Sequence, residues 1–500
     1  MNAVTTPLSG IRLNQLTRQM DAARSYAEWQ QLAQDHDQRS GANRWREADE
    51  TTLYDWQEIR GRRDKLRRCL DEGAYRELLY ALNEGVHGNM GGMGRPILYN
   101  RAMCGTKLLI DDYVATIAES LEAIHACPEA IISYPEKMDF FRRASHCYGR
   151  SALLLSGGAG LIYFHHGVVQ ELIDQDLLPN VISGASAGSI VAAQLGTLPD
   201  DILKAGYFTD KRYIEPTQTR LLEVILGRVN DDDARIAREK TLDEVIPRDM
   251  TFQDAFELTG RYINVSISPA EKHQSSRLMN AITSPNVYIR SAVSASSSIP
   301  GVIPAERLYA RGFDGKPRPY LATRRWVDGS VSGDLPAKRL SRLYGVNHFI
   351  VSLINPLVVP FVNDIKSRDR RGFKTTLSVS AIKFVEETLA VAEKMLSHSG
   401  KAGNRVAAQT AYLMRMLEQD YLGDINILLA KQDFKWRQTL FEFKAGEEQA
   451  LVAMGMRRTW TKMAMIKNAA LISKTLDRIL ESLDQQNIAP EAEGRHLIYS

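Results

Sequence analysis

The stretch from Val181 to Ile190 most constrains what this chain can fold into, because it places a serine between two glycines in a G-x-S-x-G pattern. An apolar, strand-like run precedes the pattern and a helix-like run follows it. A chain that turns sharply at Ser186 cannot carry bulky side chains two residues away, and Gly184 and Gly188 meet that need. The N-terminus of the following helix would direct backbone N–H groups toward the serine. The pattern predicts a nucleophile elbow; a small-residue turn packed against a sheet is the alternative.

A second cluster of small residues lies upstream of the serine. The apolar run Ser151–Leu155, which we predict to be a buried strand, leads directly into Ser156 and then Gly157, Gly158, Ala159 and Gly160. Acyl transfer needs N–H donors directed at the developing oxyanion, and a glycine-rich loop lets the backbone approach the reacting carbon. A nucleotide-binding loop is the alternative, but the third glycine of the dinucleotide fingerprint and the lysine of a P-loop are both missing.

A third element lies far downstream, at Arg325–Ser330. Asp328 follows two apolar residues and precedes Gly329, which suits a carboxylate at the end of a buried strand. Burial raises the pKa of a carboxyl group and makes its ionised form a better base. A structural Asp-Gly turn is the alternative.

Together these three elements resemble the patatin-like phospholipases. The resemblance implies a Ser–Asp dyad, with Ser186 as nucleophile, Asp328 as base and the loop 157–160 as oxyanion hole. Two further segments match the family, Phe164–Val168 after the glycine loop and Ala292–Pro300 before the aspartate. One departure is the Gly-Ser that follows the aspartate, where many relatives have Gly-Gly or Gly-Ala.

The flanking segments are similar to one branch of that family. His87–Gly94 and Gly105–Tyr113 resemble the domain that precedes the patatin core in fungal and plant triacylglycerol lipases, and Tyr421–Ile427 and Gly455–Lys462 also look like that branch. Some of those lipases carry a His-x-x-x-x-Asp motif linked to lysophospholipid acylation. None of the ten histidines here has an aspartate five positions later, so the sequence does not support that second activity.

The order of apolar patterns predicts an α/β protein with helical flanks. Strand-like runs at 152–155, 181–183, 262–267 and 349–354 alternate with helical segments, which predicts a mainly parallel sheet between helices. We expect a helical N-terminal domain over 1–145, a patatin-like catalytic domain over 150–356 and a helical C-terminal extension over 357–500. Helical periodicity at 13–29, 75–82, 375–396, 402–422 and 466–483 supports the flanks.

Composition limits the classes of partner. The net charge of +3 is small for 500 residues and argues against a general nucleic-acid binder. The four cysteines are scattered, so neither a disulfide framework nor a metal site is expected. Met1–Gly10 lacks the basic start and apolar core of a signal peptide, and Phe349–Val362 falls short of the roughly 20 apolar residues of a membrane span. We expect a cytoplasmic protein that needs no cofactor and no metal; its oligomeric state stays open.

One segment indicates how such a protein could reach lipid. The apolar loop Leu357–Val362 is followed by a basic run over Lys366–Lys374. An apolar tip beside a basic cluster suits peripheral docking on a membrane or lipid-droplet surface. A loop packed beneath a helix with a solvated charged flank is the alternative.

The sequence therefore predicts a serine acyl hydrolase that cleaves fatty-acyl esters of glycerolipids, either triacylglycerol or phospholipid. One alternative is an α/β-hydrolase with a Ser-His-Asp triad, for which His348 and His398 are the late candidates. His165 and His166 lie close to the glycine loop, where we expect packed rather than catalytic histidines. A non-catalytic membrane-docking protein is the other alternative, and the intact Ser186, Asp328 and glycine loop argue against it.

Overall fold

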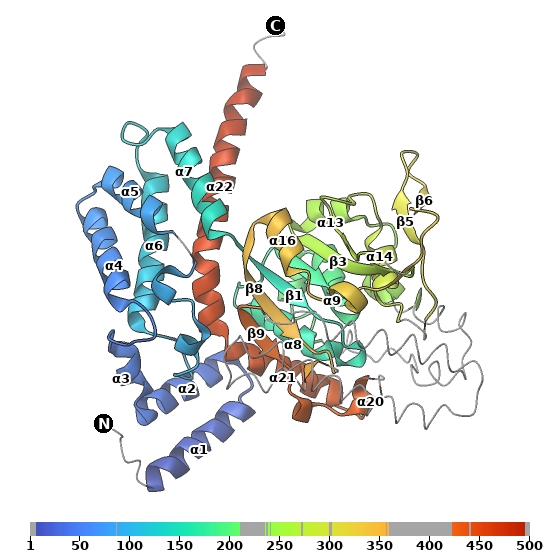
Figure 1. Ribbon diagram of the computed structural model, residues 1–500, viewed down its shortest axis with the longest axis horizontal. Coiled ribbons are helices and arrows are strands. Elements are labelled where there is room, and N and C mark those ends of the chain that lie inside the picture. The colour runs from blue at the N-terminus through green and yellow to red at the C-terminus, as the bar shows by residue number, and fades with distance from the viewer. Residues whose placement is uncertain are drawn as a thin grey trace. The chain divides into compact units, whose positions relative to one another are not determined.

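The computed structural model describes residues 7–86, 88–210, 236, 239–240, 242–271, 274–299, 303–356, 358–359, 423–439 and 442–495 (Figure 1). The chain forms two compact units that are each discontinuous in sequence. The first unit comprises Met1–Ser151, Ser341–His348 and Trp460–Ser500, and the second comprises Ala152–Leu340 and Phe349–Thr459. The two units do not coincide with the three domains expected over 1–145, 150–356 and 357–500. Those domain boundaries stay a prediction.

The first unit is helical, as its sequence periodicity predicts. Its helices are α1 (Pro7–Ala22), α2 (Tyr26–Ser40), α3 (Ala42–Glu47), α4 (Trp56–Asp71), α5 (Tyr75–Gly85), α6 (Leu108–Ala126), α7 (Tyr134–Tyr148) and α22 (Met463–Arg495), with short 3-10 turns η1 (Met90–Gly92) and η2 (Pro96–Tyr99). The buried stripe of α22, which includes Ile466, Ile472 and Leu476, explains why this C-terminal helix contacts α6 and α7. The chain returns to the first unit because this apolar face needs a partner.

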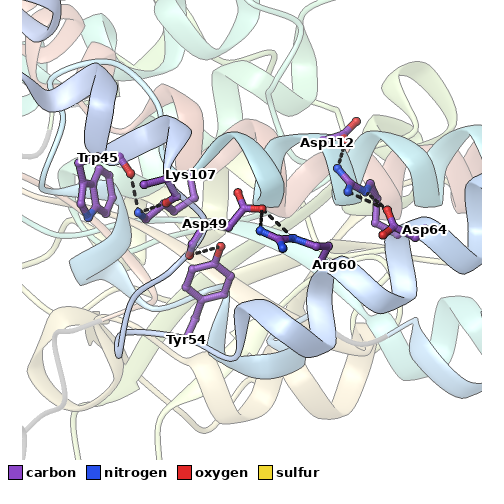
Figure 2. Close-up of polar contacts among 9 residues, drawn as sticks. Trp45, Asp49, Tyr54, Arg60, Asp64, Lys107 and Asp112 are labelled. Atoms are coloured by element: carbon purple, nitrogen blue, oxygen red, sulfur yellow. Dashed lines mark hydrogen bonds and ion pairs between the residues drawn. The ribbon is translucent and has the colours of Figure 1, made fainter.

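A buried lysine holds part of the first unit together (Figure 2). Lys107 has no exposed surface, and its ammonium donates to the backbone carbonyls of Trp45 and Ala48. The same ammonium lies 4.4 Å from the centroid of the Trp45 ring, within the range of a cation–π contact. Because carbonyls at a helix end have no partner within the helix, Lys107 satisfies the end of α3 from outside it. Burial lowers the pKa of this amine.

The second unit is built around a seven-stranded sheet, consistent with the predicted α/β class. Its strands run in the order β4-β3-β2-β1-β8-β9, and β7 also pairs with β3. The pairs β1–β2, β2–β3 and β8–β9 are parallel, whereas β4 and β7 are antiparallel to β3. The strands are β1 (Arg150–Leu155), β2 (Val181–Gly184), β3 (Tyr262–Pro269), β4 (Arg277–Met279), β7 (Trp326–Asp328), β8 (Val346–Leu353) and β9 (Ile425–Leu428).

Helices and a separate hairpin complete the second unit. Helices α9, α13 and α14 contact the central strands, and β5 (Leu308–Arg311) pairs with β6 (Pro317–Tyr320) in a two-stranded sheet of its own. The remaining elements with described bounds are η3 (Ala159–Leu161), α8 (Ile162–Asp174), α9 (Ala187–Thr197), α10 (Asp200–Lys204), α13 (Phe252–Thr259), α14 (Ile289–Ser296), α15 (Ser330–Gly333), α16 (Ala337–Tyr344), η6 (Lys431–Asp433), α20 (Trp436–Thr439) and α21 (Glu447–Trp460).

Several predicted segments lie outside the described residues. They are the helices over 375–396 and 402–422, His398 and the basic run 366–374. Of the apolar loop, only Val358 and Val359 are described, and both are buried. Within the described part of the chain, no helix combines the length and the apolar character that crossing a membrane requires.

Candidate active site

A sharp turn places Ser186 between the end of β2 and the start of α9. The serine has φ 51° and ψ −124°, a left-handed conformation that costs a residue with a side chain of order 1–3 kcal/mol. Space around the turn is equally restricted. A Cβ added to Gly184 would lie 2.2 Å from the carbonyl oxygen of Gly188, and one added to Gly188 would lie 2.2 Å from that of Leu155. The G-x-S-x-G spacing is therefore required by steric contacts, in the way a nucleophile elbow requires it.

The backbone of Ser186 is held by two other serines. Its N–H donates to Ser296 Oγ at 3.0 Å, and Ser296 Oγ donates in turn to the carbonyl oxygen of Ser266 on β3 at 2.7 Å. Ser189 Oγ donates to the carbonyl oxygen of Ser186 at 2.6 Å. These bonds over-determine the strained turn, which is how such conformations persist. Ser296 lies within the segment Ala292–Pro300, but no local sequence pattern indicates that its hydroxyl holds the elbow.

Asp328 ends the short strand β7 and is buried. The strand pairs with β3 in the register Ile267–Asp328, so the neighbouring strands β2 and β3 bring the aspartate toward the serine. A Cβ added to Gly329 would lie 1.9 Å from the carbonyl oxygen of Ser266, which explains the glycine after the aspartate. The Asp-Gly pair thus packs directly against the central sheet.

Burial raises the pKa of the Asp328 carboxyl to about 6. Two bonds from Ser330 oppose the rise, because its backbone N–H and its hydroxyl donate to Asp328 Oδ1 at 2.9 and 2.8 Å. The Ser186 hydroxyl also lowers the pKa, although among the described residues Oδ2 has no hydrogen-bond donor within 3.5 Å. We take that contact as a long one, since catalytic hydrogen bonds in unliganded enzymes are often long and tighten with substrate.

The glycine loop lies directly beside the serine. A Cβ added to Gly157 would be 3.1 Å from Ser186 Cβ and 3.3 Å from Ser330 Cβ. Ala159 opens the turn η3 with φ 47°, again a left-handed conformation. Gly158 and Ala159 stand at the start of this turn, where N–H groups have no partner within a helix, so they are the candidate oxyanion donors. Gly160 lies within the turn and is buried.

Gly157 has a different use in this structure. Its N–H donates to Asp334 Oδ1 at 2.9 Å, so it does not face a substrate oxyanion as the sequence reasoning expected for all four loop residues. Asp334 is 1% exposed and comes from the segment after α15. The sequence alone does not indicate this role, because a Gly-Asp pair is common in turns and the partner of Asp334 lies 177 residues away.

The two adjacent histidines of α8 are buried, as expected. His165 is held between Ser352 Oγ at 2.7 Å from Nδ1 and the carbonyl oxygen of Ser156 at 2.9 Å from Nε2. Burial lowers the pKa of His165 to about 4 and that of His166 to about 3. His165 therefore supports the start of the glycine loop as a neutral ring. His348 belongs to the first unit, where its ring packs 5.1 Å from the Tyr148 ring.

The described residues contain no group of three or more His, Cys, Asp or Glu side chains arranged to hold a metal ion. The chemistry that they do bring together is a strained serine, a buried carboxyl group with a raised pKa and a loop with N–H groups at its start. This combination can deprotonate a serine hydroxyl and stabilise an oxyanion.

Comparison with known proteins matches both parts of the chain. Residues 9–146 match a domain of unknown function, DUF3336, and residues 153–340 match the patatin-like phospholipases. Triacylglycerol lipase SDP1L of Arabidopsis thaliana is 28% identical over 96% of this chain and 60% of its own length. Triacylglycerol lipase 4 of Saccharomyces cerevisiae is 30% identical over 94% of this chain and 53% of its own. Among solved structures, VipD of Legionella pneumophila is only distantly similar, with a TM-score of 0.29 and 15% identity over 64% of this chain and 67% of that one.

The chain thus spans little more than half the length of these two curated lipases. Their similarity nevertheless extends across both matched domains and agrees with the elbow, the glycine loop and the aspartate of the second unit. The chain belongs to the patatin-like phospholipase family, in the branch whose patatin domain follows a DUF3336 domain.

Proposed function

We propose that this protein is a serine acyl hydrolase that cleaves fatty-acyl esters of glycerolipids through a Ser186–Asp328 dyad. The observation that carries the proposal is the placement of a buried carboxyl group, whose pKa is raised to about 6, beside a serine at a strained elbow. The names of the relatives, triacylglycerol lipases, favour triacylglycerol as substrate. A phospholipid carries the same ester and is the second candidate.

In the first half of the proposed reaction, Asp328 accepts the proton of the Ser186 hydroxyl as Oγ attacks the ester carbonyl carbon. The carbonyl oxygen becomes an oxyanion, which the N–H groups of Gly158 and Ala159 stabilise. The intermediate collapses, the C–O bond to the alcohol breaks, and the alcohol oxygen takes the proton from Asp328. An acyl-serine remains.

In the second half, a water molecule gives its proton to Asp328 and attacks the acyl-serine. The second oxyanion forms in the same loop and collapses. Ser186 Oγ leaves and regains the proton from Asp328, which releases the fatty acid. The same carboxyl group acts as base and then acid in each half, so its pKa must lie close to the working pH.

Replacing the nucleophile tests the proposal directly. Ser186→Ala should abolish both hydrolysis of a soluble short-chain ester and covalent labelling by a fluorophosphonate, since loss of a nucleophile costs many orders of magnitude. Ser297→Ala is a matched control, because the hydroxyl that it removes donates to the carbonyl oxygen of Val293 within α14 and does not touch Ser186. Labelling that persists in Ser186→Ala would show that another residue is attacked.

A second comparison separates the dyad from a Ser-His-Asp triad. Asp328→Asn should remove turnover almost as completely as Ser186→Ala, while His348→Ala and His398→Ala each keep most of it. The Asp328→Asn side chain can still accept the bonds from Ser330, so the fold should survive. Collapse of activity in either histidine variant, with an unchanged circular dichroism spectrum, favours the triad.

The substrate class and the location of the protein complete the proposal. We infer a cytoplasmic protein that docks peripherally on membranes or lipid droplets, supported by the basic run Lys366–Lys374 in the sequence. Val358 and Val359 of the apolar loop Leu357–Val362 are buried, which favours the alternative of a packed loop for that segment. Hydrolysis of a panel of triacylglycerols and phospholipids by the purified protein identifies the preferred ester. Release of fatty acid from none of them would contradict a glycerolipid substrate.

A further inference from the structure

The β5–β6 hairpin projects from the second unit as a separate two-stranded ribbon (Figure 1). Its turn is closed by backbone hydrogen bonds from Gly312 to Lys316 and from Gly315 to Gly312, both of 2.9 Å. The tip of this closed turn is Phe313, whose exposed fraction is 114%, so no part of the ring is covered. Tyr309 and Leu321 on the same ribbon are 42% and 38% exposed. An exposed aromatic ring at the tip of a hairpin can insert into the apolar region of a lipid surface.

The hairpin and the short segments on either side of it carry an excess of positive charge. Residues 306–325 contain six basic and two acidic side chains. Arg311 is paired with Asp254, and Arg318 is paired with Asp314. Within the described part of the chain, the other four basic side chains form no ion pair; they are Arg307, Lys316, Arg324 and Arg325. Their charge is available to a negatively charged partner.

A hollow of about 690 Å³ lies at the base of the ribbon. Its lining includes Tyr309 and Pro317 of the hairpin together with Arg307, Arg325 and Arg290. Arg290 is paired with Glu239 and Asp243, and Arg248, which also lines the hollow, is paired with Asp243. Arg307 and Arg325 share the hollow with the carboxylates of Asp249 and Glu306, so the hollow carries charge of both signs.

We propose that the β5–β6 hairpin docks the protein on an anionic lipid surface. Phe313 enters the acyl-chain boundary, while Lys316, Arg324 and Arg325 contact lipid phosphates. Aromatic rings and basic side chains are the two features that hold peripheral proteins at such surfaces. The choice of a lipid partner rests on the proposed function, but docking itself is measured without catalysis.

The base of the hairpin is hydrogen-bonded to β7, the strand that carries the proposed catalytic base. The backbones of Glu306 and Trp326 exchange two hydrogen bonds of 2.8 Å, which fasten the base of the hairpin to β7. The strand β7 ends at Asp328. A hairpin held at the lipid surface therefore holds the strand of the proposed base near the same surface.

Vesicle co-sedimentation of the full chain tests the proposal, using phosphatidylcholine vesicles with and without phosphatidylglycerol. Replacing Lys316, Arg324 and Arg325 together by Gln should weaken binding to the anionic vesicles at least tenfold at low salt, because each basic group near the surface contributes and salt screens it. Phe313→Ser should weaken binding about tenfold at low and at high salt, since it removes burial of a large apolar side chain.

Matched variants of the first unit control for charge and exposure. The first control replaces Arg76, Arg142 and Arg143 together by Gln, which removes the same amount of charge from exposed positions. The second control, Tyr80→Ser, removes an aromatic side chain that is 63% exposed. Both controls should bind within about twofold of the unchanged protein if docking is local to the hairpin, because distant charges are screened. All variants should keep their hydrolysis of a soluble ester.

The outcomes separate this proposal from the proposed function. Hairpin variants that sediment like the unchanged protein, or an unchanged protein that binds neither kind of vesicle, overturn hairpin docking. Hairpin-dependent binding without any ester hydrolysis overturns the proposed function and leaves docking intact. Phe313→Trp adds a direct readout, since its fluorescence, measured against the unchanged protein, should be quenched by lipids brominated on their acyl chains. Absence of quenching shows that the tip does not insert.

Discussion

Removing the Ser330 hydroxyl should move the acid limb of the pH–rate profile upward. Only the ionised Asp328 can accept the serine proton, so hydrolysis should be lost as pH falls through the carboxyl pKa of about 6. Ser330 opposes the effect of burial by donating its hydroxyl to Asp328 Oδ1 at 2.8 Å. Ser330→Ala removes this donor but keeps the Cβ that packs near Gly157 and the backbone N–H bond of 2.9 Å.

The size of the shift follows from the strength of that bond. A hydrogen bond to a charged group contributes about 1.5–3 kcal/mol, and about 1.4 kcal/mol corresponds to one pKa unit. We therefore expect the limb to rise by about one to two pH units. At pH 5.5 the variant should be at least roughly tenfold slower than the unchanged protein, while near pH 8.5 the two rates should agree within about twofold, because both carboxyl groups are then mostly ionised.

The assay is kcat/KM for a soluble short-chain ester from pH 4.5 to 9, which avoids the charge of a lipid surface. Ser189→Ala is the control, since it removes a neighbouring hydroxyl that does not touch Asp328. A limb that stays in place while the rate falls equally at every pH would show that Ser330 supports the fold and not the pKa. A limb well below pH 5 in the unchanged protein would refute a buried carboxyl base.

Three further predictions follow from other contacts. Asp334→Ala should lower kcat for a soluble ester about tenfold with little change in KM, because the Gly157 N–H loses its acceptor. Asp334→Asn keeps an acceptor and should retain most of the activity. Equal losses in both variants would contradict a positioning role for Asp334. Lys107→Met should lower the free energy of unfolding in urea by about 3 kcal/mol, because the carbonyls of Trp45 and Ala48 lose their buried donor, and an unchanged unfolding midpoint would refute this. Excess chelator should leave ester hydrolysis unchanged, and activity lost to chelator but restored by calcium would contradict metal independence.

Local steric rules made the elbow and its surroundings predictable from sequence. The requirement for Gly184 is local in sequence, because it is set by the carbonyl oxygen of Gly188 in the same turn, whereas the requirement for Gly188 is set by the carbonyl oxygen of Leu155 on the strand β1. The alternation of apolar runs likewise predicts a mainly parallel sheet, because parallel strands need helical crossovers between them. The family resemblance added the pairing of Ser186 with Asp328.

The position of Asp328 beside that serine depends on sheet order. β2, β3 and β7 are neighbours in space, although the chain visits them far apart, and no local pattern states which strands pair. The raised pKa of the carboxyl group is also a property of its surroundings, since burial comes from residues that pack on it. The packing of α22 in the first unit has the same origin, because an apolar face can be read in the sequence but its partner cannot.

The sequence by itself determined which residues can form the sharp turns and which can act as nucleophile, base and oxyanion donors: Ser186, Asp328 and the loop over 157–160. Only the tertiary structure decided what each of them faces. It placed the Asp334 carboxylate on the Gly157 N–H across 177 residues and left the Phe313 ring wholly exposed. Steric and conformational preferences act within a few residues, whereas hydrogen-bond partners and burial depend on which distant segments pack together.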